Sequence, residues 1–301
     1  MGGYLKKGAS RLRYELGYKA WQIGVSHPKQ ASYFPDLQSK NVVFSLNSGR
    51  SGSETLQKLF ECVDSVHSEH EPKPGFHEVM RLVQTRQDMA TYFVQSCRFP
   101  VIARVNKPNY VETSHLVCKG FFETIMASAV NPAFIVLKRD ARLVAKSILR
   151  LGAVPQRTRL GIQFYLSPSP SSFLQIRSDQ ELTDYQLCYW YALEIEQRQA
   201  VYSEVLSRMN GRQVSIKTQD MNSFEAVLEM FAQLGIEPTD KDLTRLRERV
   251  GGVYNHRPEA KKLETQTDFQ SEEIALEKML VPNIQCDDVL SNIRRLSTMW
   301  S

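Results

Sequence analysis

Residues 42–62, VVFSLNSGRSGSETLQKLFEC, constrain the fold of this chain more than any other stretch. They begin with an apolar, β-prone run, pass through a turn rich in glycine and serine, and end in a helical pattern. In that pattern Leu56, Leu59, Phe60 and Val63 recur at i, i+3, i+4 and i+7. The stretch therefore predicts a strand, a glycine-rich turn and the N-terminus of a helix in direct succession.

A strand–turn–helix unit of this kind can bind an anion, because unpaired N–H groups and the positive end of the helix dipole converge there. Gly49 and Gly52 allow the backbone to approach a phosphate closely. Arg50 adds a fixed charge and a fork of donors. The loop lacks the Gly-Lys-Ser/Thr ending of a Walker A motif. An ordinary strand-to-helix turn is the alternative to a phosphate-binding loop.

The composition is that of a globular protein with a sizeable core. The chain has 301 residues, of which 42% are hydrophobic and 24% charged, and no linker composition divides it. We expect a single domain over residues 1–301, with a basic N-terminal arm over residues 1–38 that packs against it. The net charge of +5 suits an anionic ligand but is too diffuse to indicate nucleic-acid binding.

The five cysteines are widely spaced and lack the spacing of metal ligands, which predicts free thiols in a reducing compartment. No apolar run approaches the length of a membrane span. The basic N-terminus has no apolar core, so it does not resemble a signal peptide. We therefore expect a soluble, cytoplasmic protein that binds neither a membrane nor a metal, and the oligomeric state stays open.

Predicted strands alternate with predicted helices along most of the chain. Further strands are expected at residues 101–104, 110–115, 134–137 and 214–217. The alternation implies an α/β fold with a central parallel sheet flanked by helices. Residues 155–180 are rich in Pro, Ser and Arg, so we expect a long loop there that acts as a lid or an acceptor-binding loop.

Arg139 follows the apolar run at residues 134–137, and Ser147 lies eight residues later, about two helical turns on. Open α/β sheets bind ligands outside the carboxyl ends of their strands. The glycine-rich loop and Arg139 should therefore share one edge of the sheet. Two anion sites at this edge would fit a nucleotide with two separate phosphates.

In the order and spacing of these motifs, residues 42–235 resemble the sulfotransferases that use 3′-phosphoadenosine 5′-phosphosulfate (PAPS). The GRSGS loop is similar to the family's 5′-phosphosulfate loop, and Arg139 with Ser147 is similar to its 3′-phosphate pair. The resemblance implies a P-loop-like sulfotransferase fold. It also implies transfer of a sulfuryl group from PAPS, as co-substrate, to a small-molecule acceptor without a metal.

The resemblance further assigns roles to residues. Arg50 would stabilise charge on the leaving bridge oxygen, while Arg139 and Ser147 would hold the 3′-phosphate. The residues expected to bind PAPS are Gly49, Arg50, Ser51, Gly52, Ser53, Glu54, Thr55, Arg139, Ser147, Asn255, Arg257 and Lys261. The last three lie where a late loop of the family often returns to the 3′-phosphate. The side chain of Glu54 is expected to turn away, because an acid beside a phosphate is unfavourable.

Sulfuryl transfer needs a base to remove the acceptor's proton. Glycan- and tyrosine-modifying members of the family use a Glu at a similar distance after the loop cation, and Glu71 lies 71 − 50 = 21 residues after Arg50. We expect Glu71 to be the base. His70 is the rival, although on a strand the two side chains would point to opposite sides. His115 could polarise the sulfuryl group or be structural, and Lys119 is expected at the surface.

The acceptor is the part of the function that the sequence specifies least. HEPKPG after GRSGS resembles sulfotransferases that modify secondary metabolites, and those acting on saxitoxin-type guanidinium alkaloids are one candidate. Sulfation of a hydroxyl and of an amine or carbamoyl nitrogen both stay open. Acids that could attract a cationic acceptor are Glu69, Glu71, Glu78, Glu181 and Asp184.

Two other functions compete with sulfuryl transfer. One is a P-loop-like small-molecule kinase, against which the missing Gly-Lys-Ser/Thr ending counts. The other is a non-catalytic regulator that binds the nucleotide without turnover. The regulator would differ from the enzyme in the role of Glu71, because Glu71→Gln should abolish activity only in an enzyme.

Overall fold

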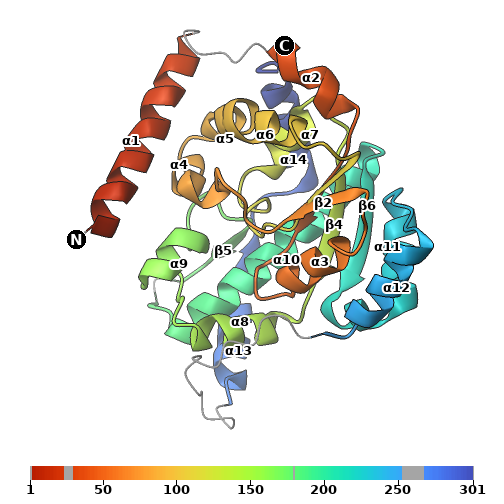
Figure 1. The fold of residues 1–301 in the computed structure, drawn as a ribbon. Helices are drawn as coiled ribbons and strands as arrows, with labels where there is room; N and C mark the ends of the chain where they lie inside the picture. The colour runs from red at the N-terminus through yellow and green to blue at the C-terminus, as the bar shows by residue number, and fades with distance from the viewer. Residues whose placement is uncertain (1, 24–29, 179, 253–267, 301) are drawn as a thin grey trace.

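A computed structural model of the protein describes residues 2–23, 30–178, 180–252 and 268–300 (Figure 1). The strands are β1 Asn41–Leu46, β2 Val66–Glu69, β3 Asn109–Glu112, β4 Ala133–Lys138, β5 Leu174–Ile176, β6 Arg212–Lys217 and β7 Leu280–Pro282. The α-helices are α1 Gly2–Gln22, α2 Gln30–Gln38, α3 Ser53–Phe60, α4 Met80–Val83, α5 Asp88–Phe93, α6 Phe99–Ala103, α7 Phe122–Ala127, α8 Ala141–Arg150, α9 Arg159–Phe164, α10 Asp184–Arg208, α11 Phe224–Gln233, α12 Asp240–Arg249, α13 Gln270–Glu277 and α14 Cys286–Ser297. Shorter helical turns are η1 Phe76–Glu78, the π-turn η2 Val94–Arg98, and η3 Thr218–Asn222.

The central sheet has five parallel strands in the order β2-β3-β1-β4-β6. Strands β5 and β7 form a separate antiparallel pair. The expected α/β class, with a central parallel sheet flanked by helices, is confirmed. Because all five strands are parallel, their carboxyl ends meet at one edge, where ligands bind in such folds.

Both faces of the sheet are covered by helices, which explains why its strands are almost continuously apolar. Phe44 and Phe134 belong to one core, together with side chains of α5, α7, α8, α10 and α14. Their neighbours Val43 and Ile135 point to the other face and join a core with α3, α11 and α12. The period-2 alternation of strand side chains thus builds two cores from one apolar run.

One prediction of local structure was wrong and a second holds only in part. Residues 101–104, expected as a strand, belong to or directly follow helix α6, in which Pro100 occupies the first turn. A short apolar run cannot distinguish a buried strand from a buried helix. Residues 155–180 are mostly loop, as expected, but they also contain α9 and β5. Strand β5 pairs with β7, which lies more than a hundred residues later, and no local sequence pattern predicts such a partner.

The N-terminal arm begins with α1, which runs along the outside of the molecule (Figure 1). Tyr14, Tyr18 and Trp21 are buried, and the Trp21 indole N–H donates to Gln95 Oε1 at 3.1 Å. These side chains attach the described end of α1 to the α5–η2 region. Among the described residues, no helix is both long and apolar enough to span a membrane.

Candidate active site

A cavity of about 1070 Å³ opens at the carboxyl edge of the sheet. Its walls come from the loop after β1, the ends of β2, β4 and β6, helix α8 and the α9 segment. Sites for single small molecules typically measure about 300–1,000 Å³. The cavity therefore has room for a nucleotide and a second molecule together.

The loop between β1 and α3 forms one wall in the way that the sequence predicts. Gly49 and Gly52 have φ angles of 69° and 87°, which favour glycine. The first hydrogen bond of the helix joins Leu56 N–H to Gly52 O at 2.9 Å, so the amide groups of residues 53–55 lie at the open end. All of residues 49–55 line the cavity except Ser51, whose buried side chain donates to Asn47 Oδ1.

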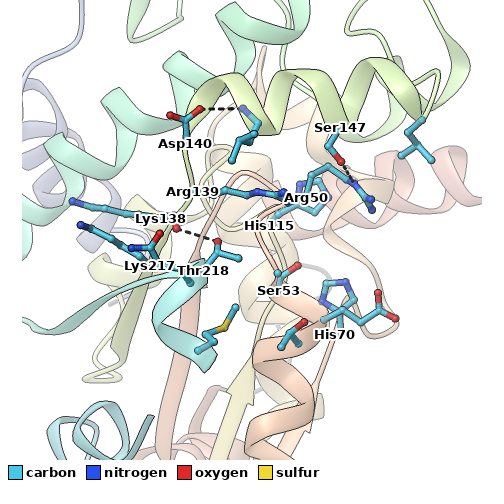
Figure 2. Close-up of a pocket in the computed structure, with 18 of the residues that line it drawn as sticks. Arg50, Ser53, His70, His115, Lys138, Arg139, Asp140, Ser147, Lys217 and Thr218 are labelled. Carbon is cyan, nitrogen blue, oxygen red and sulfur yellow. Dashed lines mark hydrogen bonds between the residues drawn. The ribbon is translucent and has the colours of Figure 1, made fainter. Parts of the chain in front are cut away.

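The two predicted phosphate motifs meet in one hydrogen-bond network (Figure 2). Arg50 Nε donates to Ser147 Oγ at 3.0 Å, and the Arg139 guanidinium donates to the Arg50 carbonyl oxygen. Burial and the nearby charge of Arg50 lower the pKa of Arg139. Two guanidinium groups therefore share a half-buried space, where a bound anion would relieve their repulsion.

Two lysines extend this positive end of the cavity, and sequence reasoning missed both. Lys138 ends β4 and Lys217 ends β6, and the two residues are paired in the strand register. Both line the cavity (Figure 2). Thr218 Oγ1, one residue further, donates to Ser51 O at 2.7 Å and so joins β6 to the loop. The signal was available, because each lysine ends a strand whose carboxyl end faces the site.

A second cluster in the cavity holds Glu71 and His115, and the His115 ring lies so close to Gly49 of the loop that it leaves no room for a Cβ there. His115 Nε2 lies 3.0 Å from Glu71 Oε1. His70 also lines the cavity, with its Nδ1 3.0 Å from Thr113 Oγ1 and its Nε2 4.0 Å from Glu71 Oε1. The prediction that His70 and Glu71 point to opposite sides was wrong. Strand β2 ends at Glu69, and Glu71 has a φ of 51°, so strand alternation no longer applies.

The protonation of this pair follows from its surroundings. Burial alone would raise the pKa of Glu71, but the hydrogen bond from His115 and the nearby basic groups of His115, His70 and Lys119 outweigh burial and lower the pKa to about 2. Burial and the neighbouring Lys119 lower the pKa of His115 to about 4, against the opposing effect of Glu71. Near neutral pH the site therefore holds a carboxylate in contact with a neutral imidazole.

Backbone strain is concentrated at the two residues to which chemistry was assigned. In the described chain four non-glycine residues have positive φ: Arg50, Glu71, Gln156 and Asn210. Such conformations cost about 1–3 kcal/mol each and persist where the surrounding structure enforces them. That Arg50 and Glu71 are among the four supports a functional reason for their placement.

Arg98 anchors the loop that carries Glu71. Its guanidinium is fully buried, and it donates to Pro72 O at 2.9 Å and to Pro74 O. Its Nε lies 3.7 Å from the buried Glu112 carboxylate. Arg98 ends the π-turn η2, a distortion of the helix that often occurs near functional sites. The loop that carries Glu71 is therefore fixed by hydrogen bonds from a buried guanidinium.

The prediction of a surface position for Lys119 was wrong. Its side chain is fully buried, and its Nζ lies 2.8 Å from His115 Nδ1. The rings of Tyr165 and Tyr191 enclose the amine, with centroids 5.0 and 4.9 Å away. A single lysine between Cys118 and Gly120 gives no local signal of burial.

One wall of the cavity is largely apolar, and its rings of Phe164 and Tyr165 lie 6.3 and 5.8 Å from the His115 ring. Leu151, Ala153, Leu160, Phe164 and Tyr165 line it, from the end of α8 to the α9 segment. Residues 155–180 therefore contribute to this wall, while closure of that segment as a lid stays a prediction.

Most of the acids proposed to attract a cationic acceptor lie elsewhere. Of the five, Glu71 alone is among the described residues that line the cavity. Glu181 and Asp184 pair with Arg157, and Glu69 accepts a hydrogen bond from Tyr110. An argument for a cationic acceptor from these acids therefore loses most of its basis.

Three predicted residues, Asn255, Arg257 and Lys261, lie outside the described residues. Glu54 lines the cavity, and the outward orientation of its side chain stays a prediction. Within the described ranges, no group of three or more His, Cys, Asp or Glu side chains is arranged to hold a metal ion.

No protein-family model matches the chain, and no curated protein matches it in sequence. Among solved structures, the chain is similar to one described as "Sulfotransferase Domain from the Curacin Biosynthetic Pathway". The sequence identity is 16% and the TM-score 0.45, over 86% of this chain and 97% of that chain. A similarity of this size supports no conclusion about function, so any functional conclusion has to rest on the geometry of the site.

Proposed function

We propose that the protein transfers a sulfuryl group from PAPS to a hydroxyl or amine-type nitrogen of a small molecule. The observation that carries this proposal is the network of Arg50, Arg139 and Ser147. It joins the two motifs expected for the two phosphates of PAPS, and it opens into the same cavity as Glu71.

The positive end of the cavity suits the charge of PAPS. The open N-terminus of α3 and Arg50 would hold the 5′-phosphosulfate. Arg139 and Ser147 would hold the 3′-phosphate, and the exposed Lys138 and Lys217 would add attraction at longer range. This division stays a proposal.

The transfer step needs positioning, charge stabilisation and one proton acceptor. The acceptor's oxygen or nitrogen would attack sulfur, while the bond between sulfur and the bridging oxygen breaks. Adenosine 3′,5′-bisphosphate leaves with the electron pair, and Arg50 would stabilise the charge that develops on its bridging oxygen. Glu71 would take the acceptor's proton. The lowered pKa of Glu71 makes its carboxylate a weak base. The proton on the attacking oxygen or nitrogen becomes more acidic as the new bond to sulfur forms, so a weak base can remove it.

The apolar wall favours an acceptor with an apolar body. Leu151, Leu160 and Phe164 would pack against that body and leave its nucleophile near Glu71. A guanidinium alkaloid of the saxitoxin type has less support, because the acids expected to attract it lie mostly outside this cavity. Participation in secondary metabolism and a cytoplasmic location stay predictions.

Calorimetric titration with adenosine 3′,5′-bisphosphate, without metal, tests the donor site. The wild type should bind it, and Arg139→Ala should weaken binding roughly 10- to 150-fold, because hydrogen bonds to charged groups are worth about 1.5–3 kcal/mol. Arg104→Ala is a matched control, because it removes an exposed guanidinium from outside the cavity. Its affinity should equal that of the wild type.

Other outcomes would favour other functions. Binding of ATP with Mg²⁺, and not of the bisphosphate, would overturn the proposal and favour a kinase. Tight bisphosphate binding without sulfuryl transfer to any acceptor in a broad screen of apolar alcohols, phenols and amines would favour a regulator.

A further inference from the structure

Lys119 contacts His115 from inside the protein. Its side chain has no solvent exposure, and it does not line the cavity, whereas its partner His115 does. The amine lies 2.8 Å from His115 Nδ1 and also donates to the Phe164 carbonyl oxygen. Lys119 can therefore act on the site only through the residues that it contacts.

The remaining surroundings of the amine are aromatic or distant. The rings of Tyr165 and Tyr191 cover it from two sides. Burial lowers the pKa of Lys119 well below its ordinary value. The titratable groups that act on the amine from neighbouring elements are Glu71, Cys118, Arg81 and Arg198. Even as a neutral amine, Lys119 keeps two N–H donors, which matches the two acceptors in contact with it.

The hydrogen bonds fix the position of the proton on His115. The Glu71 carboxylate can only accept, so His115 Nε2, 3.0 Å away, must donate. A neutral imidazole carries one proton, so His115 Nδ1 has a free lone pair. That lone pair faces the Lys119 amine, which is a donor in either protonation state.

We propose that Lys119 is a positioning residue that holds His115 in the neutral tautomer with its proton on Nε2. The nitrogen that faces the cavity is then already protonated and cannot accept a proton from the acceptor. Glu71, not His115, receives it. The assignment of the base rests on the proposed function, whereas the tautomer does not, so the two can fail separately.

The arrangement also connects three walls of the site. Phe164 and Tyr165 come from the α9 segment, which lines the cavity. Tyr191 comes from α10, and its hydroxyl donates to Ser48 O in the loop after β1. Correct packing of the α9 segment and of α10 therefore places the amine that orients His115.

Nitrogen-15 NMR of the histidine side chains tests the proposal on the ligand-free protein. The chain has six histidines, so the His115 signals are assigned by their absence from a His115→Gln variant. The wild type should show a protonated Nε2 and a bare Nδ1 at neutral pH. A proton on Nδ1 would overturn the proposal without any variant.

Two substitutions of Lys119 distinguish the effect of its hydrogen-bond donor from the effect of its charge. Lys119→Met keeps the length and removes the donor, so His115 should titrate at higher pH and form an imidazolium paired with Glu71. Lys119→Gln keeps a neutral donor and should preserve the wild-type tautomer. Lys58→Met, on the surface of α3, is the control and should leave the His115 signals unchanged.

Activity completes the test if sulfuryl transfer is established. Lys119→Met should lower turnover about tenfold or more, because the paired Glu71 no longer serves as a free base. Bisphosphate affinity should stay at the wild-type value. His115 signals unaltered by Lys119→Met would overturn the proposal. The expected NMR results, combined with absence of any transfer activity, would instead keep the tautomer and reject the proposed function.

Discussion

The two ends of the cavity are built in different ways. The positive end uses side chains at the ends of strands and one short loop, and most are partly exposed, as Arg139 and Lys217 are. The other, here called the buried end, lies beside the loop at Gly49 and joins the partly exposed Glu71 to the buried His115 and Lys119, which lie four residues apart after β3. The first end offers charge to a ligand, whereas the second fixes protons before any ligand arrives.

This difference suggests separate energetic roles. Apart from Arg50, which would also meet the charge that develops on the bridging oxygen, the charges at the edge of the sheet would bind the donor in similar ways before and during the reaction, so they contribute mainly to affinity. A preorganised acid–base pair matters mainly in the transition state, so it contributes to rate. Substitutions at the two ends should therefore change different kinetic constants.

The largest expected effect is that of Glu71→Gln on turnover. General bases contribute about 10²–10⁴-fold to rate, so turnover should fall by that factor. Bisphosphate affinity should barely change, because Glu71 is not among the residues expected to bind a phosphate. The measurement is steady-state transfer alongside calorimetry. Wild-type rates in this variant would reject Glu71 as the base and return attention to His70.

A large effect on affinity is expected from Arg50→Gly. Loss of the guanidinium should weaken bisphosphate binding roughly 10- to 150-fold, since hydrogen bonds to charged groups are worth about 1.5–3 kcal/mol. The φ of Arg50 is 55°, which glycine adopts without strain, so the melting temperature should not fall. Calorimetry and thermal unfolding measure both effects. A drop in both affinity and melting temperature would mean that Arg50 is mainly structural.

The two ends of the cavity also differ in how much of each could be predicted from the sequence. Gly49, Arg50 and Arg139 could be assigned to one edge, because strand, turn and helix patterns are local and parallel strands end together. The order of the five strands and the burial of Lys119 depend on contacts between distant segments. No local pattern distinguishes a buried lysine from the common exposed one.

The placement of His70 and Glu71 shows a second limit. Alternation along β2 predicted opposite sides for them, but the strand ends at Glu69 and the next residues turn. The turn is fixed by Arg98, whose donors reach the carbonyl oxygens of Pro72 and Pro74 from η2. The sequence position of Arg98 gives no indication of that contact.

A smaller effect is expected on the free energy of unfolding when the pH is lowered, because the buried His115 resists protonation. The pKa of His115 is about 4 in the folded protein and near 6.5 when unfolded, so between these values the unfolded chain binds more protons. Stability should therefore be full above pH 6.5 and fall as pH drops toward 4, by at most about 1.4 kcal/mol per pH unit. Glu71, with its lowered pKa, adds a loss only below its ordinary value of 4.5.

Urea unfolding of wild type and His115→Gln from pH 7 to 5 measures this term. The stability advantage of the wild type should shrink with falling pH. Parallel curves for wild type and His115→Gln would show that His115 is not held neutral by burial.

The smallest effect is expected from Ser147→Ala at the positive end. Ser147 offers one neutral hydroxyl, and a hydrogen bond of this kind is worth about 0.5–1.5 kcal/mol, or roughly 2- to 13-fold in affinity. Part of that loss should be offset, because Arg50 Nε, now bonded to Ser147 Oγ, becomes free to turn toward a phosphate. Ser147→Thr keeps the hydroxyl and should bind the bisphosphate as the wild type does. Turnover at saturating PAPS should be unchanged in both variants, whereas a fall in turnover as large as that of Glu71→Gln would show that the two ends are not separable.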